Sequence, residues 1–364
     1  MKYLTEFRDE RLAKMFAGRI AAKAEGLDNL KFMEVCGSHT MAIARYGIRR
    51  MLPDNIDLIS GPGCPVCVTP NRYLDHAIAL GRQPGIILTT FGDMLRVPGS
   101  TSSLEKERAG GSDIRIVYST MDAVAVAQKT PDKQIVFLGV GFETTAPTIA
   151  ASVVQADKLS LDNFLVLCAH KTMPRPMEAI AGGRKVPLDG FICPAHVSTI
   201  IGSEPYDFLA EKYGKYCVIA GFEPLDILEA VDMLLDQARS GTPKVEIQYS
   251  RVATSNGNPA ALKLMDEVFQ VCDAEWRGIG TIPGSGLCLN DRYARFDAAK
   301  KFSVEIEPTV EETGCICGEV MQGLAKPPEC PLFGTACTPE SPVGACMVSS
   351  EGSCAASYKY EQLV

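Results

Sequence analysis

The sequence is poor in histidine and tryptophan, and it contains no long basic or apolar run. Its 364 residues include only 4 His and 1 Trp, and the net charge is −8 at pH 7. Nucleic acid is not expected as a partner, because surfaces that bind it are basic. No apolar stretch reaches membrane-spanning length, and the first twenty residues carry acids and bases throughout, unlike a signal peptide. We expect a cytoplasmic protein that binds neither nucleic acid nor a membrane.

Cysteine, by contrast, is abundant, with 14 residues in the chain. In a reducing compartment, cysteine clusters are more often metal sites or catalytic thiols than structural disulfides. Thiolate is the soft ligand for iron, zinc and iron–sulfur clusters, and it is also the reagent of thiol–disulfide exchange. Two groups of cysteines therefore indicate a protein that binds metal in one place and transfers electrons in another. The early group is Cys36, Cys64 and Cys67, and the tail group is Cys315, Cys317, Cys330, Cys337, Cys346 and Cys354.

Short apolar runs alternate with helical patterns along most of the chain. Apolar runs separated by helices are typical of parallel sheets that are covered on both faces. The expected fold class is α/β, with two similar parallel-sheet lobes and a C-terminal cysteine-rich iron–sulfur region. Strands are predicted at 30–35, 56–60, 85–90, 114–119, 134–140, 163–169, 190–195 and 216–221, and helices at 40–51, 72–80, 146–156, 175–181 and 225–239.

The periodicity weakens after Gly241, where only a strand-like stretch at 245–250 and a helix at 259–271 are predicted. Beyond Thr309 the sequence is rich in Gly, Pro and Cys. Ligands or disulfides must hold this part, because it has too few apolar side chains to form a core. The expected segments are an N-terminal helical segment at 1–27, one lobe at 28–130 with the early thiols, a second lobe at 131–240, and a C-terminal region at 241–364.

The early thiol group has the features of an open metal or redox site. Cys36 is expected between a strand and a helix, where the helix amides and dipole would lower the pKa of its thiol. His39 could serve as a ligand, a proton donor or a helix cap. Cys64-Pro-Val-Cys67 has the spacing of redox thiols and of metal-binding turns, and both turns can meet beyond the strand ends. We expect three thiolates around an open position; a structural zinc ion and plain buried cysteines are the alternatives.

The six tail cysteines exceed the four ligands that one iron–sulfur cluster requires. Four ligands plus one redox pair is the economical division, because a cluster supplies single electrons whereas a disulfide accepts two. Cys330-Pro331 is typical of a cluster ligand, since the proline helps to shield the sulfide. Zinc sites and three structural disulfides are the alternatives, although disulfides do not suit a reducing compartment.

Other polar residues at strand ends are weaker candidates. Glu143 could contribute to the site or belong to a simple helix cap. His170, His196 and Asp93 also follow predicted strands, where they could orient other groups or take part in catalysis. Four further cysteines lie in apolar segments and are expected in the core, namely Cys168, Cys193, Cys217 and Cys272.

Distinctive motifs of the strand ends and the tail occur together in this chain. They are Cys36-Gly-Ser-His-Thr40, Gly61-Pro-Gly-Cys-Pro-Val-Cys67, Gly141-Phe-Glu-Thr-Thr-Ala-Pro147, Pro194-Ala-His-Val197 and a tail ending in Glu351-Gly-Ser-Cys354. Together they resemble the HypD family of hydrogenase maturation proteins, from about residue 30 to the end. The resemblance implies a scaffold on which the iron of the NiFe-hydrogenase active site acquires two cyanides and one carbon monoxide. It also implies a complex with the small chaperone HypC, whose N-terminal cysteine shares the iron, and with HypE, which delivers cyanide as a thiocyanate.

Carried onto this sequence, the resemblance makes Cys36 the iron-holding thiolate, with Cys64 and Cys67 as further iron ligands or as a redox pair. It implies two metal groups, namely ferrous iron carrying cyanide and carbon monoxide, and a 4Fe-4S cluster arranged as in ferredoxin:thioredoxin reductase. The protein is then an assembly scaffold rather than a conventional turnover enzyme. The expected cluster ligands are Cys315, Cys330, Cys337 and Cys354, which leaves Cys317 and Cys346 as the disulfide.

Two other functions stay open. A cluster-dependent thiol–disulfide reductase acting on a protein partner would need only the tail and would have no use for the turn at Cys36. A zinc-bound interaction module would contain neither iron nor acid-labile sulfide. The turn at Cys36 therefore separates the assembly scaffold from the reductase.

Overall fold

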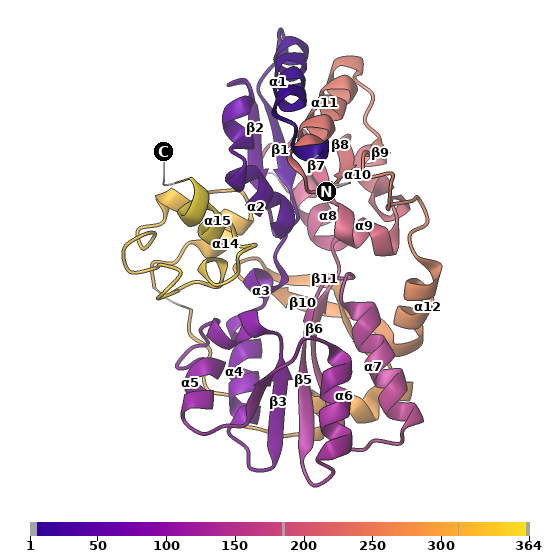
Figure 1. The fold of residues 1–364 in the computed structure, drawn as a ribbon, viewed down its shortest axis with the longest axis vertical. Helices are drawn as coiled ribbons and strands as arrows, with labels where there is room; N and C mark the ends of the chain where they lie inside the picture. The colour runs from indigo at the N-terminus through magenta and orange to yellow at the C-terminus, as the bar shows by residue number, and fades with distance from the viewer. Residues whose placement is uncertain (1–5, 184–185, 312, 362–364) are drawn as a thin grey trace.

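The computed structural model describes residues 6–183, 186–311 and 313–361. It contains two α/β lobes that lie one above the other along the longest axis, with the cysteine-rich tail beside their junction (Figure 1). One sheet is entirely parallel, and the other is parallel except for its last two strands. The expected α/β class with parallel-sheet lobes is therefore confirmed.

The first lobe contains a five-stranded parallel sheet. In sheet order its strands are β2 (Ile56–Ser60), β1 (Leu30–Glu34), β7 (Gly190–Pro194), β8 (Tyr216–Ala220) and β9 (Val245–Ile247). Its helices are α1 (Glu10–Ala24), α2 (Gly37–Arg45), α8 (Pro174–Gly182), α9 (Ala195–Ile201), α10 (Asp207–Glu211) and α11 (Pro224–Ser240). The central strand β7 is buried along its whole length, as its continuous apolar run predicts. The α1 helix packs along α11, where Arg19 and Lys23 form ion pairs with Asp232.

The second lobe contains a six-stranded mixed sheet. In sheet order its strands are β10 (Phe269–Trp276), β11 (Gly280–Leu289), β6 (Phe164–Lys171), β5 (Gln134–Gly141), β3 (Ile86–Thr90) and β4 (Ile114–Ile116). Its helices are α4 (Asn71–Gly81), α5 (Leu104–Ala109), α6 (Thr120–Lys129), α7 (Ala146–Lys158), α12 (Pro259–Val268) and α13 (Ala298–Lys301). The strand β5 lies between β3 and β6 and is buried except at its first residue.

Each lobe draws on two separate parts of the chain, which differs from the expected intervals. Residues 28–130 supply β1 and β2 to the first sheet but β3 and β4 to the second. Residues 131–240 supply β5 and β6 to the second sheet and β7 and β8 to the first. Local apolar periodicity identifies strands but carries no information about which strands pair. It therefore could not predict how the strands are divided between the two sheets.

The antiparallel hairpin of β10 and β11 is absent from the sequence-based prediction. The predicted helix at 259–271 ends at Val268, and β10 begins at the next residue. In β10, Phe269 and Trp276 are buried while Val271 is 68% exposed. A strand with one open face has a mixed pattern, which is harder to recognise than a continuous apolar run.

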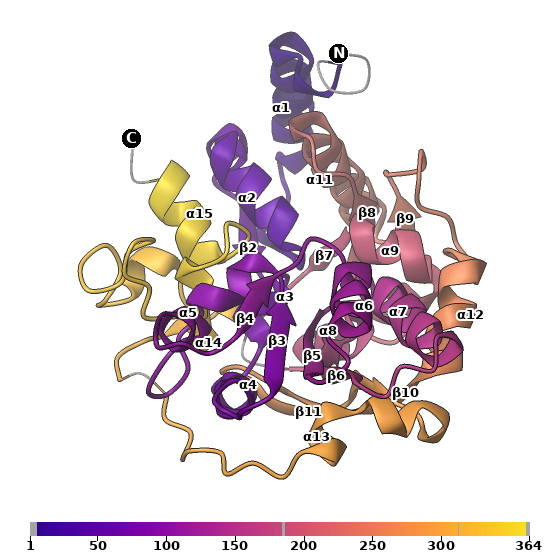
Figure 2. The same cartoon turned by 60° about the horizontal axis from the view of Figure 1, so that its bottom comes forward.

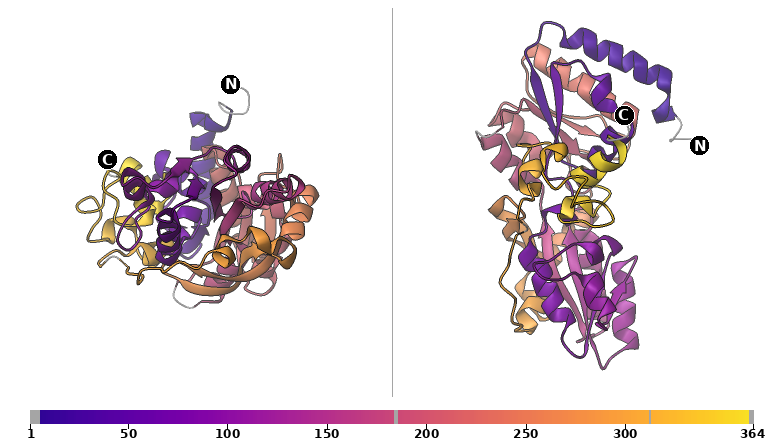
Figure 3. Two further views of the ribbon diagram at one scale, coloured as in Figure 1. Left: turned by 90° about the horizontal axis from the view of Figure 1, so that it is seen from below. Right: turned by 90° about the vertical axis from the view of Figure 1, so that its left-hand side faces the viewer.

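The tail, residues 313–361, has little regular structure. It contains the short helices α14 (Cys317–Met321) and α15 (Ser353–Tyr360), and α15 packs on α2 of the first lobe (Figures 2 and 3). None of the helices in the described ranges is long and apolar enough to cross a membrane. Short 3-10 turns lie at Glu6–Arg8, Ile48–Met51, Gly92–Arg96, Glu204–Tyr206, Asp291–Phe296, Pro327–Glu329 and Ala345–Met347.

Candidate functional site

Cys36 lies where β1 ends and α2 begins. It directly precedes α2, and only 8% of its surface is exposed. The next turn approaches it closely, because the Gly37 amide donates to the Gly63 carbonyl oxygen at 3.0 Å. A Cβ atom on Gly63 would lie 2.3 Å from the backbone nitrogen of Cys36, so only glycine allows this approach. The turns that carry Cys36 and Cys64 therefore pack against each other.

The electrostatics of Cys36 differ from the sequence-based expectation. Burial, followed by the negative charge of Glu351, raises the pKa of the thiol to about 12. The amides of Ser38 and His39 act in the opposite direction, as a helix N-terminus should, but they do not outweigh burial. The expected lowering of the pKa is therefore wrong. Without a metal ion to displace its proton, Cys36 is a neutral thiol near pH 7.

A buried carboxyl group next to Cys36 is missing from the sequence-based prediction. Glu34, the last residue of β1, is fully buried and accepts hydrogen bonds from the Thr40 hydroxyl and from the Cys36 amide, the latter at 3.3 Å. Burial raises the pKa of Glu34 to about 7. An acidic residue within the apolar run at 30–35 is the signal that could have identified it, because perturbed carboxyl groups cluster at functional sites.

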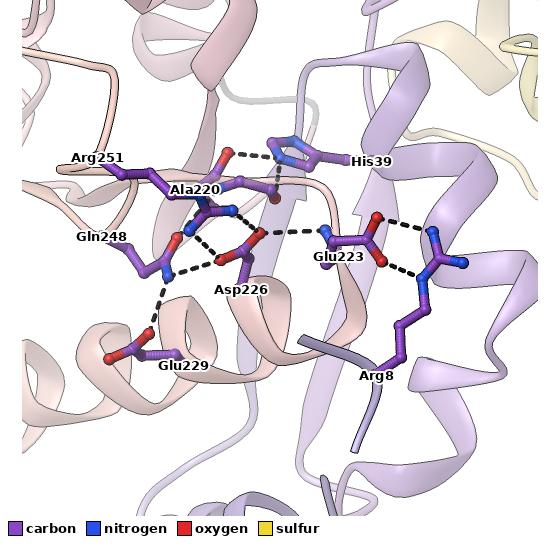
Figure 4. A network of polar contacts seen from close by, with 9 residues as sticks. Arg8, His39, Ala220, Glu223, Asp226, Glu229, Gln248 and Arg251 are labelled. Carbon is purple, nitrogen blue, oxygen red and sulfur yellow. Dashed lines mark hydrogen bonds and ion pairs between the residues drawn. The ribbon is translucent and has the colours of Figure 1, made fainter. Parts of the chain in front are cut away.

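His39 faces the end of β8 rather than a cavity. Its Nε2 lies 2.9 Å from the Ala220 carbonyl oxygen and 3.0 Å from that of Gly221 (Figure 4). Burial lowers the pKa of the ring to about 4, so the ring is neutral near pH 7 and Nε2 donates its proton to these acceptors. The buried Asp226, paired with Arg251 at 2.6 Å, belongs to the same polar network. His39 therefore ties α2 to β8.

A cavity of about 450 Å³ lies beside Cys36 at the junction of the lobes. Its walls come from the turns that follow β1, β2 and β7 of the first sheet and β5 of the second. The carboxyl ends of strands from both sheets thus face one space, which is where α/β proteins bind their ligands. The ring of His196 stacks on Phe222 with a centroid distance of 3.9 Å. Residues of the cavity wall include Cys36, Gly63, Phe142, Thr144, His196 and Glu351.

Glu143 is buried between two residues of this wall. One carboxylate oxygen accepts a hydrogen bond from the Met173 amide at 2.9 Å, and the other has no hydrogen-bond partner among the described residues. Burial raises the pKa of Glu143 to about 7. Thr145, not Glu143, is the N-cap residue of α7. Glu143 is therefore a buried, half-partnered acid rather than the helix cap.

The Cys64–Cys67 turn touches the tail. Cys64 precedes the short helix α3 (Pro65–Val68), and its sulfur accepts a hydrogen bond from the Cys67 amide at 3.3 Å. The buried Cys67 thiol donates to the Ala345 carbonyl oxygen at 3.9 Å and lies next to the thiol of Cys346, which in turn lies next to that of Cys317. A continuous row of sulfur atoms thus leads from the early group into the tail group.

All six tail cysteines line one small pocket, whose other walls are mainly apolar. The side chains of Val320, Leu332, Phe333 and Met347 surround the thiols. No three His, Cys, Asp or Glu side chains in the described ranges are gathered closely enough to hold a metal ion as they stand. Six thiols spread around an apolar space, rather than around one point, fit the donor set of a multi-atom iron–sulfur cluster with a further pair.

A buried arginine lies between the two thiol groups. Arg277, in the turn between β10 and β11, is 7% exposed, and its Nε donates to the Thr69 carbonyl oxygen at 2.8 Å. It shares a pocket with Cys315 and Cys317. The local sequence Trp276-Arg-Gly-Ile-Gly280 contains no signal for this role, because the burial of Arg277 depends on packing between distant segments.

The weaker candidates have mixed positions. His170 is fully buried, and neither ring nitrogen has a hydrogen-bond partner among the described residues. Cys193 and Cys217 are core residues, as expected. Cys168 is partly buried and packs against the core of the second lobe, whereas Cys272 is partly buried outside the core, so its expected core position is wrong. Asp93 lies apart from Cys36 and accepts a hydrogen bond from the Ser349 hydroxyl at 3.3 Å.

Comparison with known proteins bears on this site. The HypD model, described as the hydrogenase formation hypA family, matches residues 11–361. The hydrogenase maturation factor HypD2 of Bradyrhizobium diazoefficiens is 48% identical over 99% of this chain and 97% of its own length. HypD of Rhizobium leguminosarum is 48% identical over 99% of this chain and 96% of its own length. A putative hydrogenase expression/formation protein of Methanocaldococcus jannaschii is 46% identical over 99% of this chain and 100% of its own length. A match of this extent covers both lobes and the tail, and the chain belongs to the HypD family of hydrogenase maturation factors.

Proposed function

We propose that this maturation factor holds iron at the Cys36 cavity while the iron acquires its cyanide and carbon monoxide ligands. The observation that carries the proposal is the position of the cavity, at the carboxyl ends of strands from both sheets and near a row of thiols. Cys36 supplies the anchoring thiolate, and its proton leaves when iron binds, because metal ions bind the thiolate form. Iron is here the cargo of the protein.

Cys64 and Cys67 form a redox pair in this proposal, not a ligand pair. Cys67 lies next to Cys346, and thiol–disulfide exchange requires that an attacking sulfur lie next to its target. Cys317 is the next sulfur in the row. Reducing equivalents can therefore pass from the tail to the turn beside Cys36 by exchange between neighbouring thiols.

The tail is proposed to hold a 4Fe-4S cluster, which supplies electrons one at a time when it is bound. The support is the pocket that all six thiols line, in which the buried Cys317 and Cys346 are neighbours. These two cysteines form the redox pair, and the surrounding apolar side chains exclude water from the ligands. The proposed ligands are Cys315, Cys330, Cys337 and Cys354.

HypC and HypE are the proposed partners, and the reducing cytoplasm is the proposed compartment. HypC would share the iron through its N-terminal cysteine, and HypE would deliver cyanide. A cavity of about 450 Å³ has room for an iron ion with three diatomic ligands and for one partner side chain. Glu351, which accepts a hydrogen bond from Ser38 at 2.7 Å, brings the tail to the wall of this cavity.

A cluster-dependent thiol–disulfide reductase is the second candidate, because the contact between Cys67 and Cys346 alone would serve it. Such an enzyme gains nothing from the cavity at Cys36. A reductase assay on a protein disulfide therefore tests it: turnover that survives Cys36→Ala, without iron-bound diatomic ligands in the wild type, would favour the reductase.

Infrared spectroscopy of the anaerobically purified complex with HypC tests the assembly function. Iron-bound cyanide and carbon monoxide absorb where proteins do not, so the bands report the cargo directly. We expect bands from both ligands in the wild-type complex, together with iron and acid-labile sulfide by chemical analysis. A complex that contains zinc and no iron would refute the proposal.

A further inference from the structure

Arg277 is a buried cation with no acidic partner among the residues that the structure describes. Its Nε donates to the Thr69 carbonyl oxygen at 2.8 Å, and its Nη1 donates to Asn71 Oδ1. Its Nη2 has no hydrogen-bond partner, and no acidic side chain in the described ranges forms an ion pair with it. An unpaired buried charge costs several kcal/mol, so its retention points to a use for the charge.

Arg277 also lines a pocket of about 280 Å³ at the edge of the tail. Cys315 and Cys317 line the same pocket, and so do Glu311 and Glu319, which form no ion pair with the guanidinium. The charge therefore lies beside the tail thiols, with no ion pair to it among the described residues.

Close backbone packing fixes the distance between this charge and the tail. A Cβ atom on Gly278 would lie 2.2 Å from the Cα atom of Gly318, so the hairpin turn rests directly on the first residues of α14. The backbone amide of Arg277 donates to the Val68 carbonyl oxygen at 2.9 Å, which attaches the same turn to the end of α3. The turn between β10 and β11 thus contacts both α3, which carries Cys67, and α14, which begins at Cys317.

A purely structural role does not require a positive charge. The acceptors at Thr69 and Asn71 could be satisfied by a neutral amide side chain, which costs less to bury. A charge is useful, by contrast, beside a group whose own charge becomes more negative. A cluster in the tail gains one negative charge when it takes up one electron, and a fixed cation nearby stabilises that reduced state.

We propose that Arg277 is a positioning residue whose fixed positive charge raises the reduction potential of the tail cluster while its hydrogen bonds hold α3 against the tail. The inference rests on the proposed function for the cluster itself. The electron comes from an external reductant, and the side chain of Arg277 neither gains nor loses a proton in the step.

The test is a redox titration of the anaerobically purified full-length chain with dithionite, followed by electron paramagnetic resonance. Arg277→Met removes the charge at similar length, and Arg277→Lys retains the charge without the planar fork. We expect Arg277→Met to disfavour one-electron reduction about tenfold, which is a shift of about 59 mV to more negative potential. Arg277→Lys should keep most of the wild-type potential, and the shift should persist in high salt because the charge is buried.

Arg292→Met is the matched control, because it removes one positive charge from an exposed side chain paired with Glu267. Its potential should equal that of the wild type. If Arg277→Met does not fold, Arg277→Gln replaces it, since the amide retains hydrogen bonds to Thr69 and Asn71. An unchanged potential in a folded neutral variant would overturn the proposal, and so would failure of both neutral variants to fold while Arg277→Lys folds, because the charge would then serve folding.

Iron and sulfide analysis of the wild type separates this proposal from the proposed function. A wild-type chain that contains neither iron nor sulfide would refute the proposal that the tail holds a cluster. The proposed role of Arg277 would then fall with it, whereas a loaded cluster whose potential is unchanged in the folded neutral variants would overturn the role of Arg277 alone.

Discussion

The two thiol groups are positioned by different parts of the fold. The early cysteines lie in turns at the ends of parallel strands, and the sheets behind them are buried on both faces. The tail cysteines lie in irregular chain with two short helices, where the thiols themselves form much of the interior of their pocket. The early site is thus built on an apolar framework, whereas the proposed cluster would add its binding energy to the order of the tail.

This difference suits the two proposed roles. A cargo site must keep its shape while iron enters and leaves, so an apolar framework is appropriate. A resident cluster never has to leave, and its binding energy can therefore hold the surrounding chain. The following predictions test this contrast, from the largest expected effect to the smallest.

Removal of a tail ligand should disorder the tail and leave the lobes folded. Cys337→Ala should abolish the brown absorbance and lower the free energy of opening of residues 313–361 by more than about 4 kcal/mol, because loss of a metal site ranks among the largest single-residue effects. Hydrogen exchange with mass spectrometry measures the opening. Cys288→Ala, a partly exposed cysteine outside the pocket, is the control. If the tail of iron-free Cys337→Ala were still protected from hydrogen exchange, the tail would not depend on its cluster, and the contrast with the early site would be wrong.

Cys36→Ser should remove the infrared bands and leave the fold and tail cluster intact. The hydroxyl group stays protonated near pH 7 and is a hard, poor ligand for ferrous iron. Thermal unfolding should show a loss of no more than about 1 kcal/mol, since size and polarity are nearly conserved. Normal bands from this variant would mean that Cys36 is not the anchor, and the site would have to be rebuilt around Cys64 and Cys67.

Glu143→Gln should make the stability of the protein less dependent on pH between about pH 4.5 and pH 7. The pKa of Glu143 is about 7 in the folded state against an ordinary 4.5, so between these values the unfolded chain releases a proton that the folded chain keeps. Stability therefore falls as pH rises through this window, by up to about 3 kcal/mol at pH 8. In urea unfolding, Glu143→Gln should therefore be more stable than the wild type at pH 8, and the two proteins should be nearly equally stable at pH 5. Glu105→Gln, on the exposed side of α5, should not change the difference.

Gly63→Ala should push the two early turns apart. The added Cβ atom would meet the Cys36 backbone at 2.3 Å, and overpacking of this kind costs about 1–3 kcal/mol. Urea unfolding measures this loss of stability, and the infrared bands should weaken because Cys36 moves relative to its cavity. Gly92→Ala, whose Cβ atom would meet nothing within 4 Å, is the control. Equal behaviour of the two variants would show that the early turns are not tightly packed.

The sequence was sufficient to predict most strands, because parallel strands buried on both faces are nearly continuous apolar runs. The stretch at 56–60 coincides with β2, and 134–140 falls within β5. The β10–β11 hairpin was not predicted, because one face of β10 is open to solvent. The lobe boundaries were not predicted, because strand pairing depends on residues far apart in the sequence.

The candidate cysteines could be chosen from spacing and motif, but their electrostatics could not. The pKa of Cys36 depends on how deeply α2 is buried and on Glu351, more than three hundred residues away in sequence. The burial of Arg277 could not be predicted for the same reason, since its neighbours come from α3, α4 and the tail. Local pattern identifies which residues can do chemistry, whereas the fold decides their charge state and their neighbours.

The exchange of strands between the lobes has a consequence for synthesis on the ribosome. The strands β1 and β2 leave the ribosome early but cannot complete their sheet until β7, β8 and β9 have followed, and the second sheet waits for β11. Chains emerge N-terminus first at about 5–20 residues per second, so the early thiols spend several seconds in an unfinished sheet. The tail emerges last, onto lobes that are by then complete. The cluster proposed for the tail would therefore be loaded last, after both lobes have formed.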